Sequence, residues 1–167
     1  MKIVTKTFDI YNFDELSQDI KEQLIKKECE ILTENYCDFY LEEDMEEEAK
    51  ELIKKAFGEK AVFQAVRYSL SYCQGDGAMI EFNLKYYNKS IKIRHGGGHY
   101  CHENSFDILE EYGEELTEKQ YRQLHKKIYN INKQLTKSGY SFIEYDRTEE
   151  AIEQLSNYEF YENGDIY

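Results

Sequence analysis

The sequence contains no proline and no tryptophan, and it lacks any apolar run of the roughly 18 residues that a membrane-spanning helix needs. No positively charged, apolar leader segment is recognisable at its start. The four cysteines, at positions 29, 37, 73 and 101, form no CxxC pair. These absences argue against a membrane protein and against a secreted disulfide scaffold, so we expect a cytoplasmic protein with reduced cysteines.

Positive charge is scarce, with 21 Lys and Arg against 34 Asp and Glu, which leaves a net charge of −13. Nucleic acids and anionic membranes repel such a chain, which argues against nonspecific binding to either. The acidic excess lies in residues 1–60 (nine basic, seventeen acidic) and 101–167 (seven basic, fifteen acidic), whereas residues 61–100 carry five basic and two acidic residues. A basic protein surface would therefore be attracted to the two acidic flanks.

A chain of 167 residues, 41% of them hydrophobic, is long enough for one packed domain, and no linker or repeat divides it. The apolar periodicity predicts helices over residues 12–32, 45–56, 117–137 and 148–157. Gly58 and Gly139 stand where the second and third helices would end. Thr117 and Gln120 have the spacing of a capping box at the start of the third.

Alternation of apolar and polar residues is typical of strands with one solvated face. It predicts strands over residues 2–11, 61–72, 78–87 and 90–95, a further strand after the glycine-rich segment 95–106, and one more over 140–146. Asn88 favours a tight turn between two of them, and Asn163-Gly164 favours a terminal hairpin. We therefore predict a single α+β domain over 1–167, with an antiparallel meander sheet of about four to five strands packed against helices.

The stretch "YSLSYCQGDGAMIEF", residues 68–82, joins two of these strands through a glycine-rich pivot. A phosphate-binding loop would lead into a helix and would be followed by Lys and Ser or Thr at fixed spacing, but this pivot leads into a strand. Gly75 and Gly77 accept unusual backbone angles, and the Asp76 side chain can bond its own turn amides. A hairpin turn is the favoured interpretation.

The stretch "RHGGGHYCHE" gathers His95, His99 and His102 beside Cys101 and Glu103. Zinc takes three or four such ligands, so a metal site at His95, His99 and His102 is one hypothesis. A second is general acid or base catalysis by His99 or His102 with Asp76 or Glu103, if the fold brings the two glycine-rich segments together. The alternative is that neighbouring carboxylates or water satisfy these side chains, with no cofactor.

Six acids in seven positions mark the start of the second predicted helix: Glu42, Glu43, Asp44, Glu46, Glu47 and Glu48. One interpretation is a solvated helix face, tolerated near the positive end of the helix dipole. The other is a surface that docks onto a positively charged protein.

The predicted sheet also combines aromatic and basic residues, as do sheets that stack nucleic-acid bases. The tyrosines are Tyr68, Tyr72, Tyr86, Tyr87 and Tyr100, and the basic residues are Arg67, Lys85, Lys89, Lys92 and Arg94. The favoured alternative is that the tyrosines fill the core and that the basic residues keep the surface soluble.

The segments "FDELS", "SLSYCQGDG" and "HYCHE" resemble a family of small acidic phage and prophage proteins, many of them labelled antitoxins of a toxin–antitoxin stability system. The resemblance covers about residues 8–107, with the QGDG segment as its most specific part. It implies a mobile-element origin and a neutralising, protein-binding role, and it transfers no catalytic residue.

Two hypotheses follow. The favoured one is a phage- or prophage-encoded, non-enzymatic protein that neutralises a toxin or a host-defence effector, as an antitoxin or an anti-CRISPR-like inhibitor, through its acidic surface. The alternative is a small metal-assisted or acid/base enzyme that acts on nucleic acid or nucleotides through the histidine-rich segment. The sequence makes no prediction of oligomeric state.

Overall fold

A computed structural model of the chain describes residues 7–98, 101–111 and 115–167. In chain order the elements are β1 (Tyr11–Asn12), the 3₁₀ turn η1 (Phe13–Glu15), α1 (Gln18–Phe39), α2 (Leu41–Phe57), the 3₁₀ turn η2 (Gly58–Lys60), β2 (Ala61–Ser69), β3 (Gly77–Tyr86), β4 (Lys89–His95), β5 (Phe106–Glu110), α3 (Glu118–Ile143), α4 (Thr148–Leu155) and β6 (Glu159–Phe160). The predicted α+β class is confirmed. None of the helices in the described ranges is long and apolar enough to cross a lipid bilayer.

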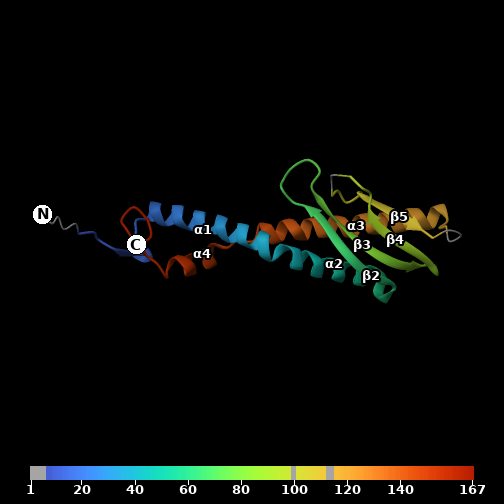
Figure 1. Cartoon of the computed structure of the whole chain (residues 1–167), viewed down its shortest axis with the longest axis horizontal. Helices are drawn as coiled ribbons and strands as arrows, with labels where there is room; N and C mark the ends of the chain where they lie inside the picture. Colours follow the sequence, from blue (N-terminus) through green and yellow to red (C-terminus); the bar gives the residue numbers. More distant parts are fainter. Residues whose placement is uncertain (1–6, 99–100, 112–114) are drawn as a thin grey trace, which may run out of the picture. The chain divides into compact units, whose positions relative to one another are not determined.

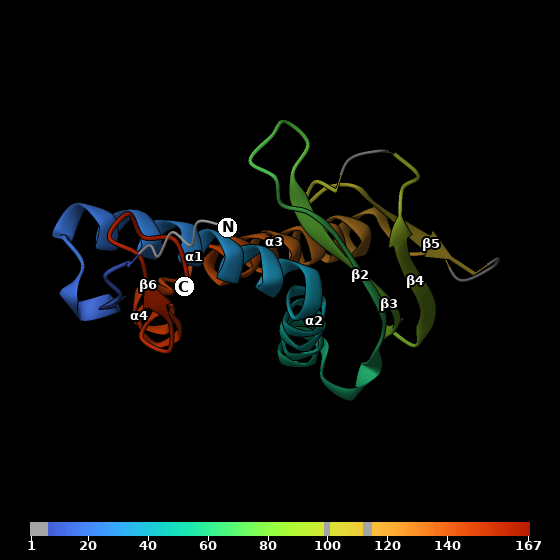
Figure 2. The same cartoon turned by 60° about the vertical axis from the view of Figure 1, so that its left-hand side comes forward.

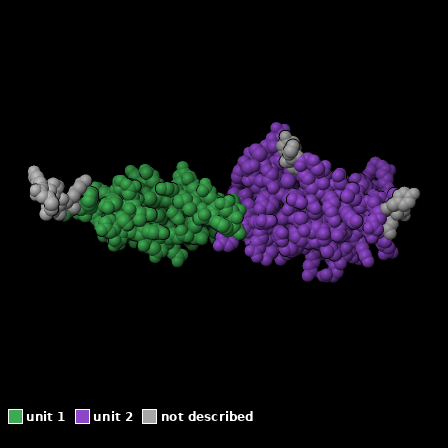
Figure 3. Space-filling model, in the orientation of Figure 1, with its two compact units in different colours: residues 1–39, 145–167 green, residues 40–144 purple. Residues whose placement is uncertain are grey.

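The chain forms two compact units, coloured separately in Figure 3. Unit 1 comprises residues 1–39 and 145–167, and unit 2 comprises residues 40–144. That the whole of 1–167 acts as one domain stays a prediction.

Unit 2 contains the meander, in which β2, β3, β4 and β5 pair antiparallel in that order (Figures 1 and 2). The period-two pattern therefore predicted the sheet correctly. β3 and β4 meet in a two-residue turn between Tyr86 and Lys89, where Tyr87 has φ 50° and Asn88 has φ 61°. Two consecutive residues with positive φ match the right-handed twist of a hairpin, as the asparagine predicted.

Helices α2 and α3 cover one face of this sheet (Figure 2). The core residues on that face are fully or almost fully buried and come from both layers: Met45, Ala49 and Ile53 of α2, Ile80, Phe82 and Leu84 of β3, Ile91 and Ile93 of β4, and Leu124, Ile128 and Leu135 of α3. Each buried Leu, Ile, Phe or Met side chain contributes about 1.5–3 kcal/mol to folding. This shared core fixes the two helices on the sheet.

The strands β3 and β4 separate at one end of the sheet. Their pairing runs from Tyr86 and Lys89 only as far as Phe82 and Ile93. Beyond that point two side chains of α3 take the place of the missing strand: Thr136 Oγ1 accepts the Ala78 amide at 2.8 Å, and Asn132 Oδ1 accepts the Ile80 amide at 3.2 Å. We call this gap the sheet fork.

Asn132 is fully buried in the fork and also donates from Nδ2 to the Glu103 carbonyl at 3.1 Å. It thereby joins α3, β3 and the segment that precedes β5. A buried backbone donor without a partner costs about 1–3 kcal/mol, so this one side chain has a large effect on the fork.

The third predicted helix begins as expected and ends later. Thr117 caps α3, and the reciprocal contacts with Gln120 form the predicted capping box. Gly139 does not end the helix, which continues to Ile143, so the strand predicted over 140–146 is wrong. A Cβ on Gly139 would lie 2.6 Å from Leu70 Cδ1 and 2.9 Å from Met45 Sδ, so the glycine permits close packing instead of stopping the helix.

In unit 1, α4 packs on α1, and β1 pairs antiparallel with β6. Its core is formed by Phe13, Leu16, Leu155 and Phe160. The predicted first strand is only two residues long within the described chain, and residues 1–6 lie outside it. The predicted terminal hairpin is confirmed by the bridge between Phe160 and Ile166 and by Gly164, whose φ is 89°.

Candidate functional site

Residues 74–76 of the QGDG segment lie in the loop that joins β2 to β3, and Gly77 begins β3, so the prediction of a hairpin is confirmed. The Asp76 carboxylate organises this loop: it accepts the backbone amides of Ser71 at 2.6 Å and Cys73 at 2.9 Å. It also accepts the Ser69 hydroxyl at 3.0 Å and the Tyr140 hydroxyl of α3 at 2.9 Å. We call Asp76 with these donors the Asp76 cluster.

The Asp76 cluster holds its carboxylate in the ionised form. Burial by itself raises the pKa of Asp76, but the hydrogen bonds from Cys73, Tyr140 and Ser69 outweigh it and lower that pKa well below the ordinary value of 3.8. Burial and the neighbouring carboxylate raise the pKa of Tyr140 to about 12. A general base needs an available lone pair and a pKa near the working pH, so this geometry favours a structural role for Asp76.

The fold brings the two glycine-rich segments into contact, as the catalytic hypothesis requires. The Cys101 amide donates to the Gly75 carbonyl at 3.2 Å. A Cβ on Gly77 would lie 2.3 Å from the Cys101 carbonyl oxygen and 3.1 Å from His102 Cα, so only glycine fits there. His102 itself lies in a turn, in which its amide donates to Ser105 Oγ at 3.0 Å.

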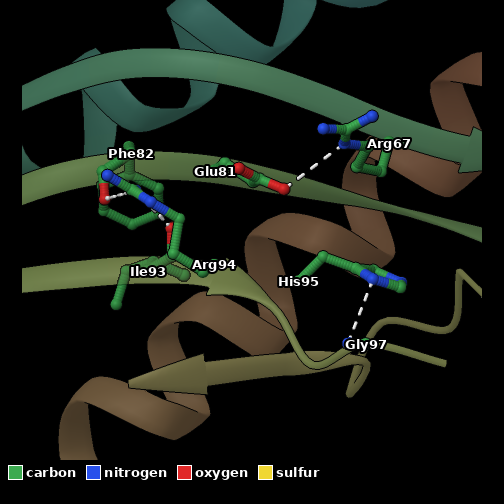
Figure 4. A network of polar contacts seen from close by, with 7 residues as sticks. All are labelled: Arg67, Glu81, Phe82, Ile93, Arg94, His95 and Gly97. Carbon is green, nitrogen blue, oxygen red and sulfur yellow. Dashed lines mark hydrogen bonds and ion pairs between the residues drawn. The ribbon is translucent and has the colours of Figure 1, made fainter. Parts of the chain in front are cut away.

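His95 and His102, two of the three histidines proposed as zinc ligands, lie in different settings. His95 ends β4 opposite Phe106, and its Nδ1 accepts the Gly97 amide at 3.3 Å (Figure 4). His99 lies outside the described residues. Among the residues that the structure describes, no three His, Cys, Asp or Glu side chains are close enough together to hold a metal ion. The metal hypothesis stays a prediction that depends on His99.

The cysteine of this segment does not provide a reactive thiolate. Burial raises the pKa of Cys101, and the positive charge of Arg67 only partly opposes that shift. The thiol therefore stays protonated at neutral pH, and a nucleophilic role would require the thiolate.

Two arginines on the open face of the sheet, Arg67 and Arg94, already have protein partners (Figure 4). Arg67 pairs with Glu81 at 3.3 Å. Arg94 donates to the Ile93 and Phe82 carbonyls at 2.7 and 3.2 Å and to the Asn83 side chain at 2.7 Å. Arg94 thus closes the end of the β3–β4 pairing at the sheet fork. These contacts favour a structural role for both arginines over tracking a phosphate backbone.

The other residues of the proposed nucleic-acid face also differ in whether they have protein contacts or are exposed. Lys89 donates to the Glu115 carbonyl, and Lys92 lies 3.9 Å from Glu111. Among the tyrosines, Tyr68 and Tyr86 are half-buried, Tyr72 and Tyr87 are exposed, and Tyr100 lies outside the described residues. Lys85 is exposed and makes no ion pair or hydrogen bond within the described residues.

The six acids of α2 do not form one continuous face. Glu46 pairs with Lys50 at 2.9 Å, and Glu48 accepts the Ser138 hydroxyl of α3 at 3.0 Å. Asp44 is half-buried. Glu42, Glu43 and Glu47 are exposed and make no ion pair within the described residues. Because successive residues of a helix point in different directions, acids that are adjacent in the sequence fall into two groups, one with protein contacts or partial burial and one exposed.

The exposed acids continue into a residue that the sequence analysis missed. Glu51 is exposed and follows Glu43 and Glu47 at four-residue spacing, so the three lie on one side of α2, opposite its buried row. We call Glu43, Glu47 and Glu51 the acidic strip. Extending the i, i+4 pattern beyond the six-acid run would have identified Glu51.

The acidic strip is unfavourable for the helix that carries it. Like charges at i, i+4 destabilise a helix by about 0.2–0.5 kcal/mol per pair, and the strip contains two such pairs. Only the first turn benefits from the helix dipole, and Glu47 and Glu51 lie beyond it. The like charges of the strip therefore make no favourable contribution of their own to the stability of α2.

Comparison with known proteins identifies no relative: no protein-family model, no curated protein and no solved structure matches the chain.

Proposed function

We propose that this chain is an acidic binding protein, encoded by a phage or prophage, that neutralises a toxin or host-defence effector in the cytoplasm of a bacterial cell. It would act as an antitoxin or an anti-CRISPR-like inhibitor by contact with a basic surface of that protein. The observation that carries the proposal is the acidic strip of Glu43, Glu47 and Glu51, exposed and without ion-pair partners in the described chain. The net charge of −13 and the resemblance of its FDELS, QGDG and HYCHE segments support it.

The strip offers a basic partner a regular row of charge. Residues four apart on a helix are separated by about 6 Å along its axis, so three carboxylates span about 12 Å. Such a row steers association by long-range attraction, and its contribution falls as salt screens it. Complementary charge raises the association rate more than it raises the final affinity. A strong dependence of the association rate on ionic strength is therefore expected.

The experiment starts with capture of the partner from the native host and its identification by mass spectrometry. Association is then measured by surface plasmon resonance for the wild type and for the triple variant Glu43→Lys, Glu47→Lys, Glu51→Lys. We expect the triple variant to associate at least about tenfold more slowly at low salt, because attraction becomes repulsion.

A matched variant distinguishes an effect of the acidic strip on binding from an effect of the total charge. Glu149, Glu150 and Glu153 of α4 are also exposed, and their replacement by lysine changes the net charge by the same amount. We expect this variant to bind nearly as the wild type does. Equal losses in both triple variants would show that only net charge matters, and no loss in the strip variant would remove the proposed function.

The second candidate is the small metal-assisted or acid/base enzyme acting on nucleic acid or nucleotides. The observation in its favour is the hydrogen bond from Cys101 to Gly75, which brings the histidine-bearing segment beside the QGDG loop. Metal analysis of untagged protein and the variant His99→Ala, His102→Ala test it. Stoichiometric zinc that disappears in this variant would favour the enzyme over the binding protein.

A further inference from the structure

A cavity of about 410 Å³ lies at the end of the unit 2 sheet where η2 leads into β2 and β3 turns into β4. Its lining comes from four elements: Ala56 and Phe57 of α2, Lys60 of η2, Leu84 to Asn88 of β3 and its turn, and Lys127 of α3. Cavities that bind small organic ligands have volumes of about 300–1,000 Å³. The cavity is therefore large enough for a small-molecule ligand, and it is distinct from the acidic strip and the Asp76 cluster.

The cavity is positively charged in an acidic protein. Its lining includes Lys60, Lys85 and Lys127 and no carboxylate side chain. Lys127 is held in place, because its Nζ donates to the Ala56 carbonyl and lies 4.4 Å from the centre of the Phe57 ring. Lys60 and Lys85 are exposed and make no ion pair or hydrogen bond within the described residues. Neither ammonium group is held by an acceptor within the described residues, and both lysines also line the adjoining cavity that contains Glu59 and Glu111.

Aromatic rings form the other part of the lining. Phe57, Tyr86 and Tyr87 line the cavity, and the two tyrosine rings lie 4.8 Å apart at 79°. Tyr87 is 60% exposed, so its ring is accessible to a ligand. Burial raises the pKa of Tyr86, which keeps its hydroxyl a neutral hydrogen-bond donor.

The backbone at Tyr87 is strained. Its φ of 50° lies in the left-handed region, and the first position of this turn type is usually Asn, Asp or Gly. A bulky aromatic residue there is uncommon, and such outliers concentrate at ligand-binding and active sites. The strain holds a large ring at the rim of the cavity, where asparagine or glycine would make the turn more easily.

We propose that this cavity binds a free nucleotide, with the base against the Tyr87 ring and the phosphates at Lys60 and Lys85. Bases of any sequence stack on aromatic rings, and lysine binds phosphate as a point charge. A free nucleotide is favoured over a nucleic-acid strand because the net charge of −13 repels a long polyanion more than a single short one. The inference does not depend on the proposed function, because it involves other residues and another ligand.

Isothermal titration calorimetry of the full chain at low ionic strength tests the proposal, with ADP, adenosine, inorganic phosphate and an eight-nucleotide single-stranded DNA as ligands. The variant Lys60→Gln, Lys85→Gln removes the two available charges. The variant Tyr87→Gly removes the ring and leaves a residue that adopts φ 50° without strain. The matched control Lys133→Gln, Lys137→Gln changes the net charge equally on an exposed part of α3 outside the cavity.

We expect saturable one-to-one binding of ADP, with adenosine and phosphate each at least about tenfold weaker. The double lysine variant and Tyr87→Gly should each weaken ADP binding at least about tenfold, whereas the control leaves it unchanged. Circular dichroism checks that each variant is folded. Absence of binding by the wild type at about 1 mM ADP, or unchanged binding in both cavity variants, would overturn the proposal. Tighter binding of the oligonucleotide than of ADP would overturn the assignment to a free nucleotide.

Discussion

Replacement of Asn132 by alanine tests whether a single side chain holds the sheet fork. The Asn132 side chain accepts the Ile80 amide and donates to the Glu103 carbonyl, and it is fully buried. Alanine has neither the acceptor nor the donor, so the Ile80 amide and the Glu103 carbonyl each lose their hydrogen-bond partner. Each unsatisfied group costs about 1–3 kcal/mol, so we expect the free energy of unfolding to fall by about 2–6 kcal/mol. That is a large part of the 5–15 kcal/mol typical of a domain.

Urea denaturation, followed by far-ultraviolet circular dichroism at neutral pH, measures this loss. The variant Asn132→Asp is a nearly isosteric companion that keeps an acceptor for Ile80 but loses the donor to Glu103. Burial disfavours the charged form, so the introduced carboxyl should have a raised pKa in the folded state. The loss of stability in this variant relative to the wild type should therefore be larger at pH 7 than at low pH, where the group is protonated and can donate again.

Two results would refute this account of the fork. A loss below about 1 kcal/mol in Asn132→Ala would mean that water or backbone movement satisfies Ile80 and Glu103. A pH-independent difference between Asn132→Asp and the wild type would mean that the site is not dry. In either case the Asn132 side chain would not be acting as the substitute for a strand at Ile80.

Three further predictions concern the other features. Asp76→Asn should remove a contribution to stability that depends on pH. The pKa of Asp76 is lowered in the folded protein, so the ionised carboxylate stabilises the fold fully above the ordinary pKa of 3.8, and this stabilisation is lost as the pH falls below that value. The difference in unfolding free energy between wild type and variant, measured by urea titration, should therefore shrink below that pH. Glu47→Lys replaces two like-charge pairs of the acidic strip by two opposite-charge pairs, so it should stabilise the protein by about 1 kcal/mol at low salt; an unchanged or lower melting temperature would contradict this. Gly77→Ala should destabilise by about 2 kcal/mol or more, because its Cβ would lie 2.3 Å from the Cys101 carbonyl, whereas in Gly96→Ala the nearest atom is 3.5 Å away and little should change.

The parts of the fold that depend on local chemistry were predictable from the sequence. The period-two runs identified β2, β3 and β4, and Thr117 with Gln120 identified the start of α3, because alternation and capping involve neighbouring residues. Gly139 was misinterpreted because a glycine that ends a helix and a glycine that permits close packing are identical in sequence. Its partners, Leu70 and Met45, are more than 65 residues away along the chain.

The candidate sites likewise combine features that local chemistry predicts with features that depend on residues distant in the sequence. The bonds from Asp76 to the amides of its own turn were predictable, because asparagine and aspartate commonly make them. The hydrogen bond from Tyr140, 64 residues further along the chain, was not. The six-acid run suggested one interaction surface, but Glu48 faces α3 and Glu46 pairs along the helix. Only knowledge of the buried side of α2 separates these from the exposed acids.

Because Thr136 and Asn132 accept backbone amides of β3, they also limit how another protein could extend this sheet. A peptide that binds by strand addition needs a row of unoccupied backbone donors and acceptors. At the fork, α3 already occupies such donors on Ala78 and Ile80. The outer edges of the described four-stranded sheet belong to β2 and β5, so a peptide that extends this sheet by strand addition would have to pair there.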